Sequence, residues 1–345
     1  MNQIKSKGVV TWQSPSNIAI VKYWGKHGSQ LPKNPSFSLT LSAAYTRTTA
    51  RFIIHQTEQK NNVSVSLDGA EQPAFIPKIT QFLDRVSDDY PFLNRIELHL
   101  ETHNSFPHSS GIASSASAMS ALALIIADIG GRSGDLQEIS RISRLGSGSA
   151  SRSIFPYGSI WGVSNEVPGS SDYFGIGMED RMHPVFKTFC DAILIVKSGE
   201  KAVSSTAGHG LMASHPFAET RYANARNRLS HLTKALETGD VATFGEICEK
   251  EALELHALMM CSDPPYILME PKTLEMIQCV LKFRKASGIP MYFTLDAGPN
   301  LHLLYPVENR NKVSDFIQKE LIQYCENGKW IDDAVGTGPN KIMQS

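Results

Sequence analysis

The feature that most constrains the fold is a change, about half-way along the chain, from short strand-like runs to long helical patterns. Several runs in the first half alternate polar and apolar residues, as strands do when one face of their sheet covers a core. They lie at residues 18–23, 38–41, 46–55, 63–67 and 96–101. One clear helical pattern follows at 113–129, and Gly130-Gly131 ends it.

The second half mixes long helices with a few apolar strands. Strand-like runs at 192–196, 291–295 and 301–305 are combined with helical patterns at about 217–237, 240–260, 271–286 and 311–325, before a short terminal segment at 334–336. The two kinds of element do not alternate regularly, which predicts an α+β fold rather than a doubly wound sheet. We place a boundary near residue 188, with an N-terminal lobe at 1–188 and a C-terminal lobe at 189–345.

Composition argues against several classes of function. Lysine and arginine total 33 against 34 aspartate and glutamate residues, a net charge of −1, so the chain lacks the basic field that nucleic-acid binding needs. No run approaches the roughly 18 apolar residues of a membrane span, and the N-terminus lacks the apolar core of a signal peptide. Five widely spaced cysteines without a C-x-x-C pair are typical of reduced thiols. We therefore expect a cytoplasmic protein with neither nucleic acid nor membrane as partner.

The segment Pro107-His-Ser-Ser-Gly-Ile-Ala-Ser-Ser-Ala-Ser117 is a loop of small residues that runs into the helix at 113–129. The free N–H groups of a first helical turn, the helix dipole and nearby serine hydroxyls suit a phosphate group. The Gly-Lys-Ser/Thr ending of a Walker A loop is missing. A serine-capped, tightly packed helix without a ligand would explain the same residues.

Two lysines flank two aromatic residues in Asn17-Ile-Ala-Ile-Val-Lys-Tyr-Trp-Gly-Lys26. A cation in an apolar strand is costly unless it meets an anion, so we expect Lys22 to face a carboxylate or a phosphorylated ligand. The alternative is a lysine on an edge strand that reaches solvent.

Two further segments carry groups suited to anions or proton transfer. Gly146-Ser-Gly-Ser-Ala-Ser-Arg-Ser153 combines hydroxyls with Arg152 on a turn that we expect to start a helix. Asp296, in Thr294-Leu-Asp-Ala-Gly-Pro-Asn300, ends an apolar strand, where a turn-capping role is the alternative. Taken alone, the first segment is better explained by a plain Gly/Ser loop with a surface arginine.

Taken together and in this order, these motifs resemble the diphosphomevalonate decarboxylases of the GHMP kinase superfamily over residues 14–340. The phosphate loop alone is shared across the superfamily, whereas Lys-Tyr-Trp-Gly-Lys and Asp-Ala-Gly-Pro-Asn are more specific to the decarboxylases. The resemblance implies a two-lobed GHMP fold, with a mixed sheet and helices in the N-terminal lobe and a ferredoxin-like α/β sandwich in the C-terminal lobe. It also implies a homodimer with ATP and Mg²⁺ as cofactors.

The implied reaction converts (R)-5-diphosphomevalonate and ATP to isopentenyl diphosphate, CO2, ADP and phosphate. By resemblance, Asp296 positions or deprotonates the 3-hydroxyl and Lys22 lies beside it. The resemblance implies that the substrate diphosphate is bound by Tyr23, Lys26, Ser147 and Ser149, and that Arg152 binds the substrate carboxylate. It implies that the loop binds the ATP phosphates, with Ser115 as the Mg²⁺ ligand and Ser204 or Ser205 near the transferred phosphate. The loop residues are Pro107, Ser109, Ser110, Gly111, Ile112, Ala113, Ser114, Ser115 and Ser117.

Three residues depart from the family pattern. His108 and His209 stand where less polar residues are familiar, and Thr206 stands where some bacterial members carry an arginine that reaches the diphosphate. With one cation fewer, a 5-monophosphate substrate becomes an alternative. A small-molecule kinase and a binding protein that has lost catalysis are further alternatives, against which the retained Lys22 and Asp296 argue.

Overall fold

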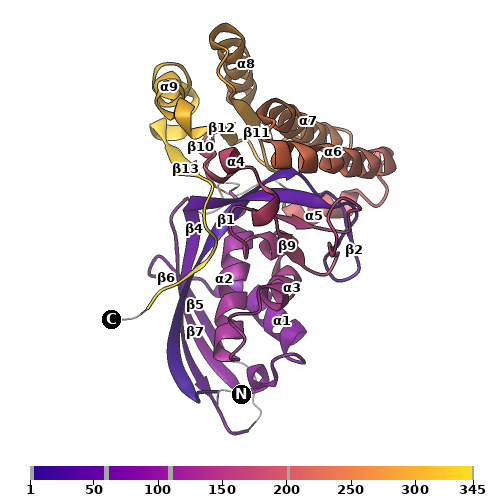
Figure 1. Cartoon of the computed structure of the whole chain (residues 1–345). Coiled ribbons are helices and arrows are strands. Elements are labelled where there is room, and N and C mark those ends of the chain that lie inside the picture. The colour runs from indigo at the N-terminus through magenta and orange to yellow at the C-terminus, as the bar shows by residue number, and fades with distance from the viewer. Residues whose placement is uncertain (1–3, 58–61, 108–111, 200–202, 344–345) are drawn as a thin grey trace.

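A computed structural model describes residues 4–57, 62–107, 112–199 and 203–343 and shows two bodies, each built around its own sheet (Figure 1). One sheet has eight strands and the other four, and helices pack against both. The predicted α+β class is confirmed. Within the described residues, none of the helices combines the length and apolar character needed to cross a bilayer.

The eight-stranded sheet is formed almost entirely by the first half of the chain. Its main path runs β14-β1-β4-β7-β5-β6, with β8 beside β4 and β9 beside β8, and only the β5–β7 pair is parallel. The strands are β1 (Lys7–Val21), β4 (Ser36–Ile54), β5 (Asn62–Leu67), β6 (Ala70–Glu71), β7 (Ile96–Asn104), β8 (Gly158–Trp161), β9 (Gly175–Gly177) and β14 (Asn340–Lys341).

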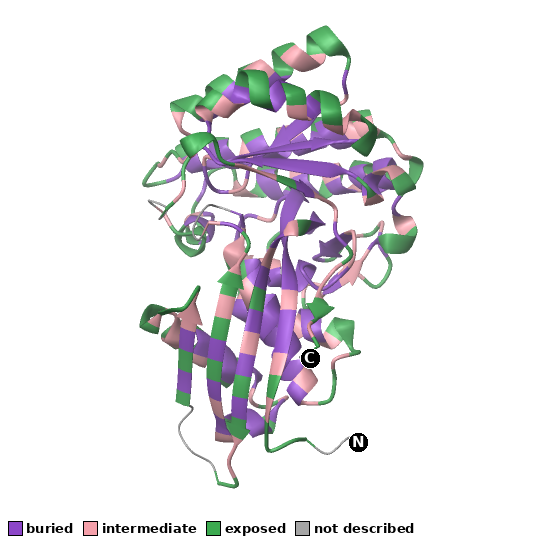
Figure 2. Ribbon diagram, turned by 90° about the vertical axis from the view of Figure 1, so that its left-hand side faces the viewer, coloured by how far each residue is buried: buried purple, intermediate pink, exposed green. Residues whose placement is uncertain are grey.

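Three helices cover one face of this sheet (Figure 1): α1 (Ile76–Val86), α2 (Ser114–Ile129) and α3 (Leu136–Gly146). Buried and exposed residues alternate along the outer parts of β4, β5 and β7 (Figure 2). This is the pattern of an antiparallel-rich sheet with its other face open. α2 is the helix predicted at 113–129, and it is buried over most of its length because it lies between the sheet and α3.

The four-stranded sheet has the order β11-β12-β10-β13 and is antiparallel throughout. Along the chain, helices separate β10 from β11 and β12 from β13, which is the βαββαβ arrangement of a ferredoxin-like sandwich, as expected. The strands are β10 (Cys190–Leu194), β11 (Tyr292–Thr294), β12 (Leu301–Tyr305) and β13 (Trp330–Ala334). The helices are α6 (Ala218–Thr238), α7 (Val241–Met260), α8 (Pro271–Ser287) and α9 (Arg310–Phe316), the last continuing in π and 3₁₀ turns to Tyr324.

The chain passes between the two sheets at two adjacent points. It enters the four-stranded sheet after Phe189 and leaves it at Val335, whose N–H donates to the Phe189 carbonyl at 2.9 Å. Beside this point, the Asp333 carboxylate accepts three backbone N–H groups, from residues 42–44 of β4, at 2.6–2.9 Å. The chain then returns to the first sheet as β14, which pairs with β1.

Four short elements complete the surroundings of the site. The strands β2 (Lys26–His27) and β3 (Leu31–Pro32) pair in a two-stranded sheet. The other two elements are the short helices α4 (Pro184–Lys187) and α5 (Ser205–Leu211).

Candidate active site

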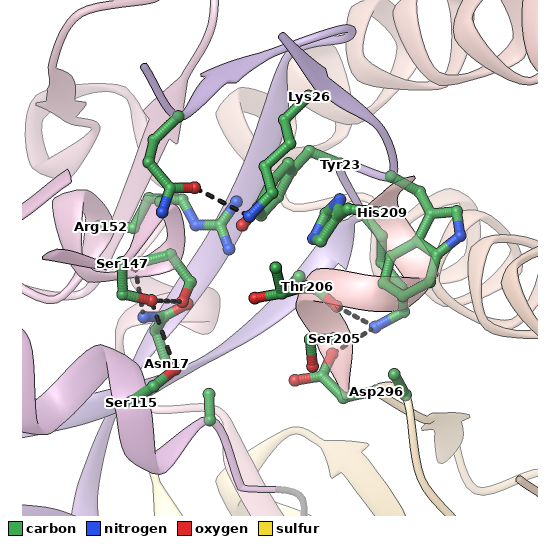
Figure 3. A pocket seen from close by; sticks show the side chains of 18 of the residues that line it. Asn17, Tyr23, Lys26, Ser115, Ser147, Arg152, Ser205, Thr206, His209 and Asp296 are labelled. Carbon is green, nitrogen blue, oxygen red and sulfur yellow. Dashed lines mark hydrogen bonds and ion pairs between the residues drawn. The ribbon is translucent and has the colours of Figure 1, made fainter. Parts of the chain in front are cut away.

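A cavity of about 170 Å³ collects most of the predicted site residues (Figure 3). Its walls come from the end of β1, the turn leading to β2, the start of α2, the turn after α3, the helix α5 and the loop after β11. Among the described residues its lining has four cationic side chains and one carboxylate, an excess of three positive charges (4 − 1 = 3). These charged residues are Lys22, Lys26, Lys78, Arg152 and Asp296.

Lys22 and Asp296 form an ion pair at the cavity wall. Lys22 directly follows β1, and its Nζ lies 3.1 Å from Asp296 Oδ1 and donates to the Ala19 carbonyl at 2.7 Å. The lysine side chain is only 3% exposed, so the alternative of a lysine in solvent is wrong and the expected carboxylate partner is confirmed. The Asp296 side chain keeps 26% exposure, which leaves it accessible from the cavity.

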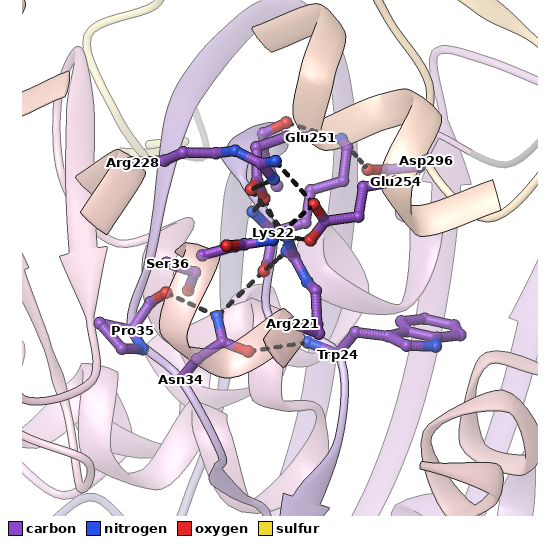
Figure 4. A network of polar contacts seen from close by, with 12 residues as sticks. Lys22, Trp24, Asn34, Pro35, Ser36, Arg221, Arg228, Glu251, Glu254 and Asp296 are labelled. Carbon is purple, nitrogen blue, oxygen red and sulfur yellow. Dashed lines mark hydrogen bonds and ion pairs between the residues drawn. The ribbon is translucent and has the colours of Figure 1, made fainter. Parts of the chain in front are cut away.

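A buried polar network holds the backbone of Lys22 in place (Figure 4). The Lys22 N–H donates to Glu251 Oε2 at 2.8 Å, and the Lys22 carbonyl accepts from Arg221 Nη2 at 2.5 Å. Glu251 on α7 and Arg221 on α6 also pair with each other at 2.6 Å, both with fully buried side chains, and Arg228 adds a third charge. The helices of the second sheet therefore fix the position of a residue that belongs to the first.

Three serine hydroxyls form a row along one wall of the cavity. Ser115 Oγ at the start of α2 lies 3.3 Å from Ser147 Oγ, which lies 3.3 Å from Ser149 Oγ. Asn17 joins this wall from β1 by donating to the Ser149 carbonyl at 3.2 Å. The two segments interpreted as separate anion sites thus lie side by side and face one space.

The start of α2 has the features expected of an anion site. Its N-cap residue Ala113 has a left-handed backbone (φ 42°), and no side chain among the described residues caps the free N–H groups of the first turn. Those groups lie at the edge of the cavity, where Ala113 and Ser115 contribute to the lining. They are available to a ligand oxygen.

Arg152 is a buried cation that no described carboxylate pairs with. The residue is 2% exposed, its Nη1 donates to Ser36 Oγ, and its Nε is buried without a hydrogen-bond partner among the described residues. The guanidinium lies over the rings of Tyr23 (5.4 Å) and Trp161 (6.0 Å). Burial lowers the pKa of Arg152. A buried cation is costly unless it meets an anion, so this group suits an anionic ligand.

Lys26 and Lys78 are two further cations of the cavity for which the described part of the chain provides no carboxylate partner. Lys26 Nζ donates to Gln30 Oε1 at 2.9 Å. Burial lowers the pKa of Lys26, and the nearby positive charges of Lys78 and Arg85 lower it further. Repulsion between these cations is relieved when an anion binds among them.

Of the remaining predicted residues, some line the cavity and others lie outside its lining. Ser205 lines the cavity, whereas Ser204 caps α5 by accepting from the Ala207 N–H at 3.2 Å. Ser117 lines no described cavity, because its hydroxyl is fully buried and lies 2.7 Å from Thr46 Oγ1. Ile112 is buried in the core and Pro107 lies outside the cavity lining. Ser109, Ser110, Gly111 and His108 lie outside the described residues.

The segment 146–153, expected to start a helix, begins only a short one. α3 ends at Gly146, and a 3₁₀ helix over Gly148–Arg152 follows. Gly148 is needed for this geometry, since a Cβ there would lie 2.7 Å from the Trp161 ring and 2.8 Å from the Tyr23 hydroxyl. The turn brings Arg152 inward instead of onto the surface.

Sequence reasoning missed several lining residues, of which Asn17, Lys78 and His209 are the most polar. Asn17 lies within a motif that was singled out for other residues. Lys78 lies on α1, which the spacing of Ile76, Ile79, Phe82 and Leu83 would have indicated. His209 was noticed only as a departure from a pattern, and nothing in its local sequence places it in the cavity.

A second, mostly apolar cavity adjoins the first. It lies between the sheet and α1 and α2, and both cavities share Lys78 and Ser115. Ser114 lines this second cavity rather than the first. Its apolar lining includes Val65, Leu67, Phe75, Ile79, Leu100, Ala118, Met119 and Leu122.

Comparison with known proteins gives the same assignment in both halves of the chain. Residues 14–172 match the family model of the diphosphomevalonate decarboxylase-like N-terminal domain, and residues 192–340 match that of the mevalonate 5-diphosphate decarboxylase C-terminal domain. The chain is 31% identical to the diphosphomevalonate decarboxylase of Eremothecium gossypii, over 90% of this chain and 80% of that protein. The chain belongs to the diphosphomevalonate decarboxylase family.

Other diphosphomevalonate decarboxylases resemble this chain in sequence or structure over nearly its whole length. The Candida albicans protein is 30% identical, over 96% of this chain and 97% of its own. The structure of mevalonate diphosphate decarboxylase from Staphylococcus aureus has a TM-score of 0.83 at 28% identity, with 98% of both chains covered. A structure named "MDDEF in complex with MVAPP, AMPPCP and Magnesium" has a TM-score of 0.82 at 30% identity, over 97% of this chain and 99% of that one. The expected GHMP-type fold is thereby confirmed.

Proposed function

We propose that this chain catalyses the ATP-dependent decarboxylation of (R)-5-diphosphomevalonate to isopentenyl diphosphate, CO2, ADP and phosphate. The observation that carries the proposal is a buried Arg152 and a Lys26, both without a carboxylate partner among the described residues, in one cavity with the Lys22–Asp296 pair. A substrate with anionic groups at both ends and a hydroxyl between them fits this arrangement.

The substrate-binding roles follow from where the charges lie. Lys26 and Tyr23, with the Ser147 and Ser149 hydroxyls, hold the diphosphate. Arg152 holds the carboxylate with its planar guanidinium. The 3-hydroxyl then faces Asp296, whose carboxylate is held by Lys22 at 3.1 Å.

Asp296 and Lys22 act on the group that is phosphorylated. Asp296 orients the 3-hydroxyl and accepts its proton as the oxygen takes the terminal phosphoryl group of ATP and ADP leaves. Lys22 offsets the negative charge on the transferring group. The C3–O bond then breaks and phosphate departs with its electron pair. Electrons from the bond between C2 and the carboxylate form the new double bond as CO2 is released.

The start of α2 is proposed to hold the ATP phosphates, with Ser205 on the opposite wall near the transferred group. The Ser115 hydroxyl, at the start of α2 and in the cavity lining, is proposed as a protein ligand for Mg²⁺. A hydroxyl oxygen suits this role, because Mg²⁺ takes oxygen ligands and is held largely by the substrate phosphates and water. When bound, Mg²⁺ supplies positive charge to the phosphates.

The second cavity is proposed to hold the adenine. It is apolar, and it meets the first at Ser115, where the nucleotide phosphates are placed. A planar base between β5, β7 and α2 would leave the phosphates directed toward the serine row.

A 5-phosphomevalonate decarboxylase is the second candidate. Residue 206 lines the cavity as a threonine, so it adds no cation for a second phosphate. The predicted lobes 1–188 and 189–345 are retained as a proposal, which the separate sheets support except at β14, a strand near the C-terminus that pairs in the first sheet. The homodimer and the cytoplasmic location stay predictions.

The test is product analysis. Purified protein is given ATP and Mg²⁺ with either 5-diphosphomevalonate or 5-phosphomevalonate, and CO2, ADP and the organic product are measured. Equimolar CO2 and ADP with isopentenyl diphosphate support the proposal. Preference for the monophosphate selects the second candidate, and ADP without CO2 overturns both in favour of a kinase.

A further inference from the structure

His209 is a buried side chain in the cavity that the proposed mechanism does not use. It lies on α5, is 6% exposed and lines the cavity beside Lys26 and Thr206 (Figure 3). Its ring stacks on Tyr23 at a centroid distance of 4.6 Å and lies 4.5 Å from the ring of Trp24. An imidazole held on two aromatic rings has little freedom to reorient.

A backbone hydrogen bond fixes which ring nitrogen carries the proton. The Gly25 N–H donates to His209 Nδ1 at 2.9 Å, so Nδ1 is an acceptor and a neutral ring must carry its hydrogen on Nε2. Burial, together with the positive charges of Lys26 and Arg152, lowers the pKa of His209 to about 3. The ring is therefore neutral at physiological pH. Among the described residues no acceptor pairs with Nε2.

Two glycines let the backbone segments around the ring pack closely. Gly25 has φ 104°, and a Cβ there would collide with the Tyr222 hydroxyl. On α5, a Cβ on Gly208 would lie 2.7 Å from the ring of Trp24. These two glycines allow the turn before β2 and the helix α5 to approach until Gly25 reaches His209.

We propose that His209 is a substrate-binding residue whose Nε2–H donates a hydrogen bond to the phosphate end of the phosphorylated substrate. Lys26, which holds that end in the proposed function, lines the same cavity beside His209 (Figure 3). A neutral donor adds a hydrogen bond without adding a further charge to a cavity that already has three excess positive charges. The inference rests on the proposed function and assigns part of its phosphate recognition to α5.

Two substitutions separate the donor from the packing of the ring. In His209→Asn the amide oxygen can replace Nδ1 as acceptor for Gly25, but no donor reaches the position of Nε2. In His209→Gln the longer amide places a donor near that position. We expect His209→Asn to raise the KM and Kd for 5-diphosphomevalonate about tenfold, the loss of one hydrogen bond to a charged group, with kcat within about twofold. We expect His209→Gln to stay within about threefold of the wild type, and ATP binding to be unchanged in both.

Nitrogen NMR of the wild-type protein gives a readout that does not depend on a variant. With ¹⁵N-labelled histidine, the His209 signals should show a protonated Nε2 and an unprotonated Nδ1 between pH 5.5 and 8. Addition of inorganic pyrophosphate should shift the Nε2–H proton downfield. A protonated Nδ1, or an Nε2–H that does not respond to pyrophosphate, would overturn the assignment.

The outcomes also distinguish this inference from the proposed function. If the wild type releases CO2 but a folded His209→Asn binds the substrate as tightly as the wild type, only the role of His209 is wrong. Equal losses in the Asn and Gln variants would assign the effect to ring packing and would likewise reject a hydrogen bond. If the wild type neither binds nor converts 5-diphosphomevalonate, the proposed function itself fails.

Discussion

The ammonium nitrogen of Lys22 lies 3.1 Å from a carboxylate oxygen of Asp296, although 274 positions separate the two residues in the sequence. Lys22 follows a strand of the first sheet, and Asp296 follows a strand of the second. The pair therefore exists only when both bodies are folded and packed against each other.

Asp296→Asn should reduce turnover by at least about a hundredfold, because the amide cannot accept the proton of the 3-hydroxyl. ATP affinity should change little, since the proposed nucleotide contacts lie at the start of α2. CO2 release and calorimetric ATP binding measure the two effects. Asp332→Asn, at a half-exposed carboxylate paired with Arg310 at 2.7 Å, is the matched control and should retain activity. Full activity in the Asp296 variant would reject the mechanism.

Arg152→Met should leave the ligand-free protein as stable as the wild type or make it more stable, because a buried cation without a carboxylate partner is removed. Substrate should bind at least about tenfold more weakly, and the rise in Tm that substrate causes should disappear. Thermal unfolding with and without 5-diphosphomevalonate tests both. Arg144→Met is the contrasting control. Arg144 is equally buried but donates to the carbonyls of Ser29 and Tyr173, so its loss should lower the Tm without substrate.

Glu251→Gln should destabilise the protein by about 3 kcal/mol at neutral pH, because Arg221 is left without its full charge partner. Burial raises the pKa of Glu251, but the charge of Arg221 and the hydrogen bonds from Arg221 and Arg228 outweigh it, so the net shift is downward. A carboxyl with a lowered folded-state pKa stabilises the protein above its unfolded pKa, about 4.3, and loses this effect as the pH falls through the folded value.

The difference in unfolding free energy between wild type and Glu251→Gln should therefore be constant from pH 5.5 to 8 and shrink below about pH 4.3. Urea unfolding at several pH values measures it. Glu246→Gln, at an exposed residue of the same helix, should change the unfolding free energy by no more than about 0.5 kcal/mol. A difference that grows on acidification would contradict the assignment.

Burial and the neighbouring charges lower the pKa of Lys26. Since Lys26 binds the substrate phosphate only while it is protonated, the KM for substrate should rise at a pH below the ordinary lysine pKa of about 10.4. Lys78→Met removes one of those charges and should move the rise to higher pH. KM measured between pH 7.5 and 10.5 gives both midpoints. Lys282→Met, at an exposed lysine on α8, should leave the midpoint unchanged. An unchanged midpoint in the Lys78 variant would show that this charge does not act on Lys26.

Ala118→Phe should weaken ATP binding about tenfold or more, because the new ring fills the second cavity, which Ala118 lines. Binding of 5-diphosphomevalonate in the absence of nucleotide should be unchanged, since Ala118 does not line the first cavity. Titration with each ligand separates the two sites. Normal ATP affinity in a folded variant would place the adenine elsewhere.

The longest strands were only partly predictable from sequence. β1 covers 15 residues and β4 covers 19, but local patterns indicated only their most regular parts. Gly8, Ser14, Pro15 and Ser16 are poor strand formers, and β1 has a register shift between Pro15 and Asn17. Pairing with β4 on one side and packing against α2 keep these residues extended, and neither contact is visible in a local window.

The residues of the site were likewise only partly predictable from sequence. Lys22 could be interpreted from its own surroundings, because a lysine next to an apolar strand requires an anion. Its partner, and the serine row formed by Ser115, Ser147 and Ser149, depend on how separate segments pack. His209 could not have been placed at all, since only the approach of α5 to Gly25 brings it into the cavity.

The two adjacent chain crossings at Phe189 and Val335 have a topological consequence. Because the chain enters the four-stranded body at one crossing and returns at the other to form β14, that body is an insertion within the fold of the first sheet. The two bodies also share a buried apolar cluster, which includes Ile18 and Phe37 from the first sheet and Leu229 and Phe244 from α6 and α7. We therefore expect the two bodies to unfold together, since their separation would expose this shared core to water.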